Sequence, residues 1–236
     1  MLQTLLIFLL GSSIFSFLNV VIYRMPLHMD IIIAPSCCKV CGHRLSALDM
    51  IPVLGWVMLG GRCRYCRTKV SIRYPAIEAL GGCTALLCVR YWGIHWQALI
   101  AFSFLAVLTA IAFIDIDTMK IPDSLIITAG LTGLFSIPFF PVPGLPERII
   151  GIFSVSVILL ILALIIPSGF GGGDIKLMAA CGLFLGWRQS FTAFILAVLT
   201  AGGYCILMLA AGKMERKSKL SFGAFLCLGM AVTLFI

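Results

Sequence analysis

The stretch QALIAFSFLAVLTAIAFIDID, residues 97 to 117, runs through 18 uncharged residues before its first charge at Asp115. A helix of about 20 apolar residues is long enough to cross a lipid bilayer. A second stretch, Gly171-Gly172-Gly173-Asp174-Ile175-Lys176, also places an aspartate beside an apolar segment, in a chain with only nine acidic residues. Because a carboxylate at membrane depth is costly, Asp115 and Asp174 are each a hypothesis for a functional site.

The composition assigns the chain to the polytopic membrane proteins. It is 61% hydrophobic with a mean hydropathy of +1.14, whereas soluble domains are about 45–50% apolar. We expect an all-α protein with about eight transmembrane helices, near residues 2–23, 75–92, 97–114, 124–140, 148–166, 175–187, 190–211 and 220–236. The first is expected to be retained, since residues 1–19 have neither a basic region nor an A-x-A cleavage site.

The basic residues predict the orientation of the chain. Eight of the 17 Lys and Arg lie between residues 24 and 73, and four lie between residues 213 and 219. Basic loops are retained in the cytoplasm, so we expect these loops inside and both termini outside. Asp115 and Asp174 then lie on the cytoplasmic side. The basic balance does not predict nucleic-acid binding, because no aromatic-basic motif accompanies it.

The two aspartates suggest a pair that shares one proton, which is the chemistry of an aspartyl protease. Asp117 is the main competitor for the catalytic role, although it points elsewhere on a helix. Asp123 follows Pro122 and precedes an apolar run, which is typical of a helix N-cap. Lys176 either tunes Asp174 or anchors its helix at the membrane interface.

The segment of residues 24–74 carries two CxxC pairs, which are Cys38 with Cys41 and Cys63 with Cys66. Their spacing is within a residue of a known zinc pattern, and four thiolates can close a tetrahedral structural site. A reduced thiol cluster is the alternative, and Cys37 could replace Cys38 as a ligand. We expect three parts: the first span at residues 1–23, the zinc-binding loop at 24–74 and a membrane core at 75–236.

Several motifs, in this order, resemble those of the bacterial prepilin peptidases, which are leader peptidases and N-methyltransferases. They are residues 16–26 (SFLNVVIYRMP), Asp49-x-Ile51-Pro52, Gly61-Arg62-Cys63-Arg64-x-Cys66, Ile72-Arg73-Tyr74-Pro75-x-x-Glu78, residues 115–123 (DIDTMKIPD) and Gly171-x-Gly173-Asp174. The last is the GxGD motif of intramembrane aspartyl proteases. The resemblance runs nearly from end to end.

The resemblance implies a peptidase of the bacterial inner membrane with Asp115 and Asp174 as catalytic residues. Gly171, Gly173 and Lys176 would support the catalytic loop. The implied substrates are prepilins or pseudopilins, which are cut after a glycine at the cytoplasmic face. Membrane lipid is the other expected partner, and nucleic acid is not expected.

The second implied reaction is methylation of the new N-terminus by S-adenosylmethionine, although no GxGxxG-like site for this donor occurs in the sequence. Glu78 either binds the substrate amine or is solvated at the interface. Three alternatives remain: a peptidase without methylation, an ion-coupled transporter that uses intramembrane acids, and a scaffold protein with the zinc loop as its docking module.

Overall fold

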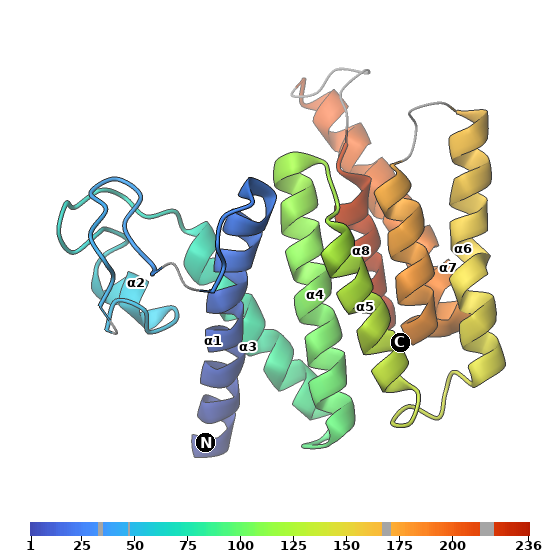
Figure 1. Cartoon of the computed structure of the whole chain (residues 1–236), viewed down its shortest axis with the longest axis horizontal. Coiled ribbons are helices and arrows are strands. Elements are labelled where there is room, and N and C mark those ends of the chain that lie inside the picture. Colours follow the sequence, from blue (N-terminus) through green and yellow to red (C-terminus); the bar gives the residue numbers. More distant parts are fainter. Residues whose placement is uncertain (33–34, 47, 167–170, 213–219) are drawn as a thin grey trace. The chain divides into compact units, whose positions relative to one another are not determined.

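The computed structural model describes the 236-residue chain except for residues 33–34, 47, 167–170 and 213–219. The basic cluster at 213–219 therefore lies outside the described residues. The elements are helical, which confirms the all-α class (Figure 1). They are α1 (Leu2–Arg24), η1 (Met25–Leu27), α2 (Leu54–Met58), α3 (Arg73–Trp92), α4 (Trp96–Thr118), α5 (Asp123–Ser136), α6 (Leu145–Ile165), α7 (Gly172–Ala210) and α8 (Phe222–Thr233).

The chain forms two compact units, Met1–Ala98 and Leu99–Ile236. This division differs from the three parts expected from the sequence, and that organisation stays a prediction. Four helices are long and apolar enough to cross a membrane among the described residues: Leu2–Leu27, Trp96–Thr118, Leu145–Ile165 and Gly172–Ala210. Two shorter apolar helices, α5 and α8, accompany them. The chain is therefore a multi-pass membrane protein.

In the first unit, α1 and α3 pack closely because small residues face each other. A side chain at Gly11 would strike the backbone of Gly81, and a side chain at Gly81 would strike the ring of Phe15. Without a hydrophobic driving force between helices in lipid, such close contact of small residues holds transmembrane helices together. The loop of residues 25–72 returns to this helix pair through Lys39, whose Nζ lies 3.4 Å from the centre of the Tyr23 ring.

In the second unit, α7 is divided by non-helical backbone at Gly186, where φ is 73°. Figure 1 shows the two segments of α7 running in opposite directions. The predicted segments 175–187 and 190–211 therefore both lie in α7 and meet at this turn. A side chain at Gly186 would strike Pro143, so glycine serves both the left-handed backbone and the close approach.

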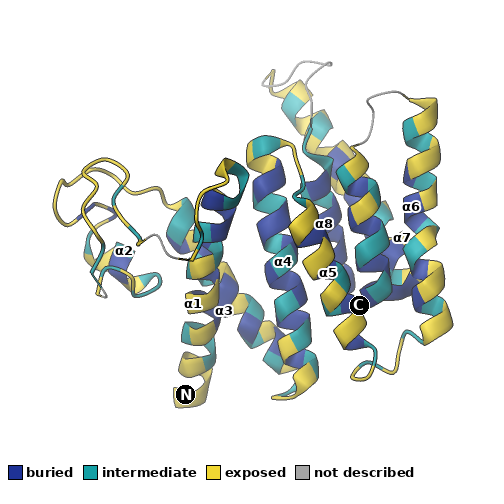
Figure 2. Ribbon diagram, viewed as in Figure 1, coloured by how far each residue is buried: buried dark blue, intermediate teal, exposed yellow. Residues whose placement is uncertain are grey.

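The core of the second unit lies along α4 and the first segment of α7, where Phe104 stacks on Phe184 with ring centres 4.3 Å apart. Figure 2 shows α4 with many buried residues, whereas much of α6 is exposed. The exposed side chains of α6 are mostly large and apolar, for example Ile150, Phe153 and Leu164. A multi-pass protein presents such a face to lipid.

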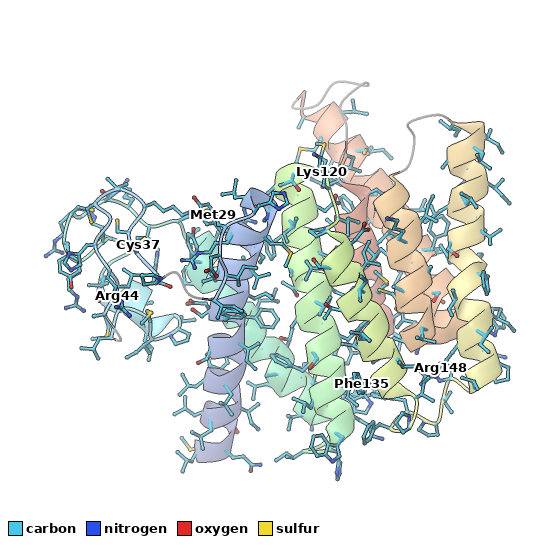
Figure 3. The ribbon with its side chains drawn as sticks, in the orientation of Figure 1. Met29, Cys37, Arg44, Lys120, Phe135 and Arg148 are labelled. Atoms are coloured by element: carbon cyan, nitrogen blue, oxygen red, sulfur yellow. The ribbon has the colours of Figure 1, made fainter. Side chains whose placement is uncertain are left out.

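Arg148 of α6 is only 1% exposed, yet it carries a guanidinium group. Its nitrogens donate to oxygens of the last residue of α5, of the α5–α6 connection and of the first α7 segment. The acceptors are Ser136 Oγ at 2.6 Å, Phe140 O at 3.0 Å, Pro143 O at 2.9 Å and Leu183 O at 2.9 Å. These hydrogen bonds offset the cost of burying the positive charge. Figure 3 shows Arg148 and Lys120 at opposite ends of this unit.

Candidate active site

Asp115 lies in the last turn of α4 and is 5% exposed. Its Oδ2 accepts a hydrogen bond of 3.1 Å from the backbone N–H of Ala224, 109 residues later in the chain. Directly after this turn, Met119 adopts a left-handed backbone with φ 52°, and its N–H donates to the carbonyl oxygen of Asp115 at 2.8 Å. This reversal ends α4 and leads the chain into α5.

Asp174 lies in the first turn of α7 and is 7% exposed. Its N–H donates to the carbonyl oxygen of Gly171 at 3.1 Å, and its Oδ2 accepts from the N–H of Gly171 at 3.3 Å. The Asp174 carboxylate, at the third helical position, thus accepts from the N-cap N–H, as the acidic residue of a capping box does, while glycine at the N-cap contributes only backbone atoms. This contact orients the Asp174 carboxylate toward the core of the unit.

The two carboxylates converge at Gly223, in the first turn of α8. A Cβ atom placed on Gly223 would lie 2.9 Å from Asp115 Oδ2 and 3.0 Å from Asp174 Oδ1. Three helices, α4, α7 and α8, therefore meet where the acids face each other. The structure brings together the two aspartates that the sequence singled out, with both side chains nearly removed from solvent.

Asp117 and Asp123, the other two acids of the 115–123 motif, do not share the position of Asp115 and Asp174. Asp117 is exposed on α4. The prediction that Asp123 caps α5 was wrong, because Pro122 is the N-cap and Asp123 is the first helical residue. The Asp123 carboxylate instead pairs with Lys176 Nζ at 2.9 Å, with both side chains more than half exposed. Lys176 thus joins the starts of α5 and α7, and its support of the catalytic loop stays a prediction.

The glycines of the 171–174 motif differ in what surrounds them. A side chain at Gly173 would meet Cβ of Ile121 at 3.1 Å, so this glycine allows the α4–α5 connection to pack against α7. A side chain at Gly171 would first meet Asp174 Oδ2 at 3.4 Å. A side chain at Gly172 would meet no atom within 4 Å. The motif therefore requires glycine most strongly at position 173.

The four predicted cysteine ligands form one cluster in the first unit. Their Sγ atoms all lie within 4.8 Å of one another, and those of Cys38 and Cys66 are 3.7 Å apart. Tetrahedral zinc with Zn–S bonds of about 2.3 Å requires sulfurs about 3.8 Å apart, so the cluster fits zinc. Cys66 Sγ also hydrogen-bonds to the Thr68 hydroxyl, with the two atoms 3.3 Å apart.

Each cysteine pair is held in a turn of the same geometry. The N–H of Gly42 donates to the carbonyl oxygen of Cys38 at 2.9 Å, and that of Arg67 donates to the carbonyl oxygen of Cys63 at 3.0 Å. Gly42 and Arg67 both have left-handed backbones, with φ of 68° and 59°. The matching turns point both pairs of thiols at one place. Cys37, the alternative ligand, is exposed and is not one of the four.

Glu78 lies in α3 and connects three parts of the first unit. Its Oε1 accepts from the Ser16 hydroxyl of α1 at 2.6 Å, and its Oε2 accepts from the backbone N–H of Val53 at 2.7 Å. Binding of a substrate amine by Glu78 stays a prediction. The contacts present give this carboxylate a role in holding the cysteine loop against α1.

Gly223 and Ala224 contact the acid pair but were not singled out by the sequence. Neither carries a titratable group, and the segment around them, Ser221-Phe222-Gly223-Ala224, holds no recognisable chemical motif. Their only signal in the sequence was a glycine near the start of the last apolar segment. A backbone donor and an absent side chain become visible only when the helices are packed.

Comparison with known proteins gives two family matches. Residues 9–92 match the bacterial peptidase A24 N-terminal domain, and residues 102–206 match the type IV leader peptidase family. No solved structure gives a significant match.

Similar proteins include three named prepilin leader peptidase/N-methyltransferase. The protein of Burkholderia pseudomallei (strain 1026b) is 33% identical over 96% of this chain and 83% of its own length. The protein of Aeromonas salmonicida (strain A449) is 31% identical over 94% of this chain and 87% of its own length. The protein of Bacillus subtilis (strain 168) is 29% identical over 95% of this chain and 90% of its own length. With matches of this extent, the chain belongs to the prepilin leader peptidase/N-methyltransferase family, peptidase family A24.

Proposed function

We propose that this protein is a membrane-embedded aspartic endopeptidase that removes the basic leader of type IV prepilins or type II secretion pseudopilins. Cleavage follows a glycine at the cytoplasmic face. The observation that carries the proposal is the convergence of Asp115 Oδ2 and Asp174 Oδ1 on the position of Gly223. Membership of the family and the names of the similar proteins support the substrate class.

The chemistry follows from two carboxyl groups that share one proton. The ionised carboxylate takes a proton from water while the water oxygen bonds to the scissile carbonyl carbon. The neutral carboxyl group gives its proton to the carbonyl oxygen, which yields a gem-diol. The C–N bond then breaks as the first carboxyl group protonates the leaving nitrogen, and one hydroxyl of the gem-diol returns a proton to the second. Both groups regain their starting states.

The products match a second reaction on the same substrate. Cleavage leaves a free amine on the mature protein, and methylation of this amine from S-adenosylmethionine is the activity that the relatives' names add. S-adenosylmethionine supplies an electrophilic methyl group, and the uncharged amine supplies the electron pair. Glu78 is our proposed contact for the substrate amine. The alternative is a peptidase without methylation.

The proposed topology has about eight membrane crossings, with both termini in the periplasm and the cysteine loop in the cytoplasm of the inner membrane. The basic residues of the loop support this orientation. The loop would hold one structural zinc ion through Cys38, Cys41, Cys63 and Cys66. A cytoplasmic loop of this size has too little apolar core to fold without such a staple.

The test is cleavage of a prepilin by the purified protein in detergent, followed by intact mass. Asp115→Asn and Asp174→Asn should each lower the rate by more than about 1,000-fold. Asp117→Asn, on an exposed side chain of the same helix, is the matched control and should cut at the wild-type rate. With S-adenosylmethionine present, the product should gain the mass of one CH2 unit, because a methyl group replaces one hydrogen of the amine. Equal cleavage by wild type and both aspartate variants, or none by wild type, contradicts the peptidase.

The same proteins distinguish the ion-coupled transporter, which also uses intramembrane acids. Reconstituted wild-type protein should give no proton or sodium flux above that of Asp115→Asn. A flux that disappears in Asp115→Asn, together with absent cleavage, would establish the transporter instead.

A further inference from the structure

The start of α8 is capped from a distant part of the chain. Ser221 is the N-cap residue, but its side chain makes no capping hydrogen bond. The backbone N–H of Ala224, the third helical residue, instead donates to Asp115 Oδ2 at 3.1 Å. This is a position that an N-cap side chain normally serves. Asp115 therefore replaces Ser221 as the acceptor at this helix terminus.

This arrangement holds both acids at the starts of helices. The first turn of a helix carries partial positive charge, and its N–H groups stabilise an anion. Asp115 accepts from the Ala224 N–H of α8 at 3.1 Å, and Asp174, in the first turn of α7, accepts from the Gly171 N–H at 3.3 Å. Each carboxylate is thus fixed in place by one backbone N–H group at a helix start.

Gly223 is also the residue that keeps the space between the acids open. A Cβ atom there would lie 2.8 Å from Ile121 Cδ1, as well as 2.9 and 3.0 Å from the two carboxylate oxygens. Gly223 has no positive φ that would require glycine for backbone reasons. What excludes a larger residue at this position is the group of atoms around it, of which two are the catalytic oxygens.

From the proposed peptidase function, we infer that Gly223 is a positioning residue of the active site. Its missing side chain leaves room for the attacking water between the carboxylates, and the first turn of α8 holds the Asp115 carboxylate beside this space. A water molecule activated by both groups must hydrogen-bond to both at once, and the Gly223 position is where both are within reach.

The decisive variant is Gly223→Ala. The added methyl group occupies the space between the carboxylates while the substrate still binds elsewhere, so kcat should fall by about 100-fold or more with KM changed by less than about threefold. Gly202→Ala, in the second segment of α7, is the matched control, because its methyl group meets no atom within 4 Å. This control should keep the wild-type kcat and KM. Thermal unfolding in detergent checks that each variant is folded.

A purely structural role for Gly223 predicts something different. In that case the loss of kcat arises from the clash with Ile121. Ile121→Val, which lacks the Cδ1 atom, should then restore kcat in the double variant. We expect the double variant Gly223→Ala/Ile121→Val to unfold near the wild-type temperature and to remain inactive, since the methyl group still separates the acids. Ile121→Val alone should cut normally.

The outcomes separate this inference from the peptidase function. If wild type cuts and the aspartate variants do not, the peptidase stands, and a Gly223→Ala protein with wild-type kcat overturns the role of Gly223 alone. Recovery of kcat in the double variant also overturns it. A wild-type protein that cuts no prepilin overturns the peptidase and this inference together.

Discussion

The Glu78 carboxylate accepts a hydrogen bond of 2.7 Å from the backbone N–H of Val53, a residue 25 positions earlier. Val53 has φ of 62° and ψ of −52°, a backbone conformation that a β-branched residue adopts only under constraint. The hydrogen bond fixes this strained residue just before α2, so the cysteine loop is positioned by a side chain of α3.

Removal of the Glu78 carboxylate should therefore loosen the cysteine loop. In Glu78→Ala, the Val53 N–H and the Ser16 hydroxyl lose their acceptor, which costs about 1–3 kcal/mol of loop stability. Limited proteolysis should cut residues 25–72 faster than in wild type. Ser16→Ala removes one of the two contacts and should have the smaller effect. If the loop of Glu78→Ala resists protease as in wild type, the structural role of Glu78 is wrong.

Replacement of Arg67, whose backbone is left-handed, by glycine should stabilise the cysteine loop. A non-glycine residue in this conformation costs about 1–2 kcal/mol, so Arg67→Gly should raise the chelator concentration at which the loop loses its metal. Gly42→Ala is the reciprocal variant. Its methyl group meets no atom within 4 Å, so any loss of stability comes from the backbone alone. The chelator concentration should rise for Arg67→Gly and fall for Gly42→Ala. Changes in the same direction would contradict the matched turns.

Metal analysis should find one zinc ion per chain. Cys41→Ser should lose the ion, because a tetrahedral site retains only three of its ligands. Cys37→Ser is the control, since Cys37 lies beside the cluster without belonging to it. Loss of zinc from Cys37→Ser and retention in Cys41→Ser would assign the ligands differently.

Replacement of Arg148 should destabilise the second unit strongly. Arg148→Met removes the donor to Ser136 Oγ, Phe140 O and Leu183 O, at a cost of at least about 3 kcal/mol. Arg188→Met, on an exposed arginine of α7, should change the unfolding temperature little. Thermal unfolding of both variants in one detergent measures the difference, and equal unfolding temperatures contradict the role of Arg148.

The pair of Asp49 and Arg64 should make the loop sensitive to acid. The hydrogen bond from the Arg64 guanidinium, at 2.8 Å, lowers the pKa of Asp49, whose side chain is 2% exposed. Its stabilisation is therefore present above the unfolded pKa of about 3.9 and is lost as the pH falls through the lower folded value. Wild type should exceed Asp49→Asn in loop stability at pH 7, and this difference should shrink below about pH 4.

The comparison with Asp49→Asn isolates this carboxylate. Acid also protonates the cysteine thiolates, but it does so in both proteins. A stability difference that stays constant between pH 7 and pH 3 would show that Asp49 contributes through its shape and not through its charge.

The local patterns of the sequence were sufficient for the membrane class, the apolar segments and the chemical groups of the site. Asp115 and Asp174 stand out because charge is costly beside a long apolar run, and the cysteines stand out by their spacing. These signals depend on residues that are close together in the chain, so they can be recognised before any packing is known.

Only the tertiary structure decided which groups meet. Gly223 lies beside Asp115, although the two residues are 108 positions apart in the chain. What matters at Gly223 is the lack of a side chain, and this leaves no chemical signature in the sequence. The pairing of Asp123 with Lys176 and the burial of Arg148 likewise depend on how helix ends come together. Such contacts are set by the interlocking of helices over their whole length, and a periodic pattern along one helix does not specify its neighbour's register.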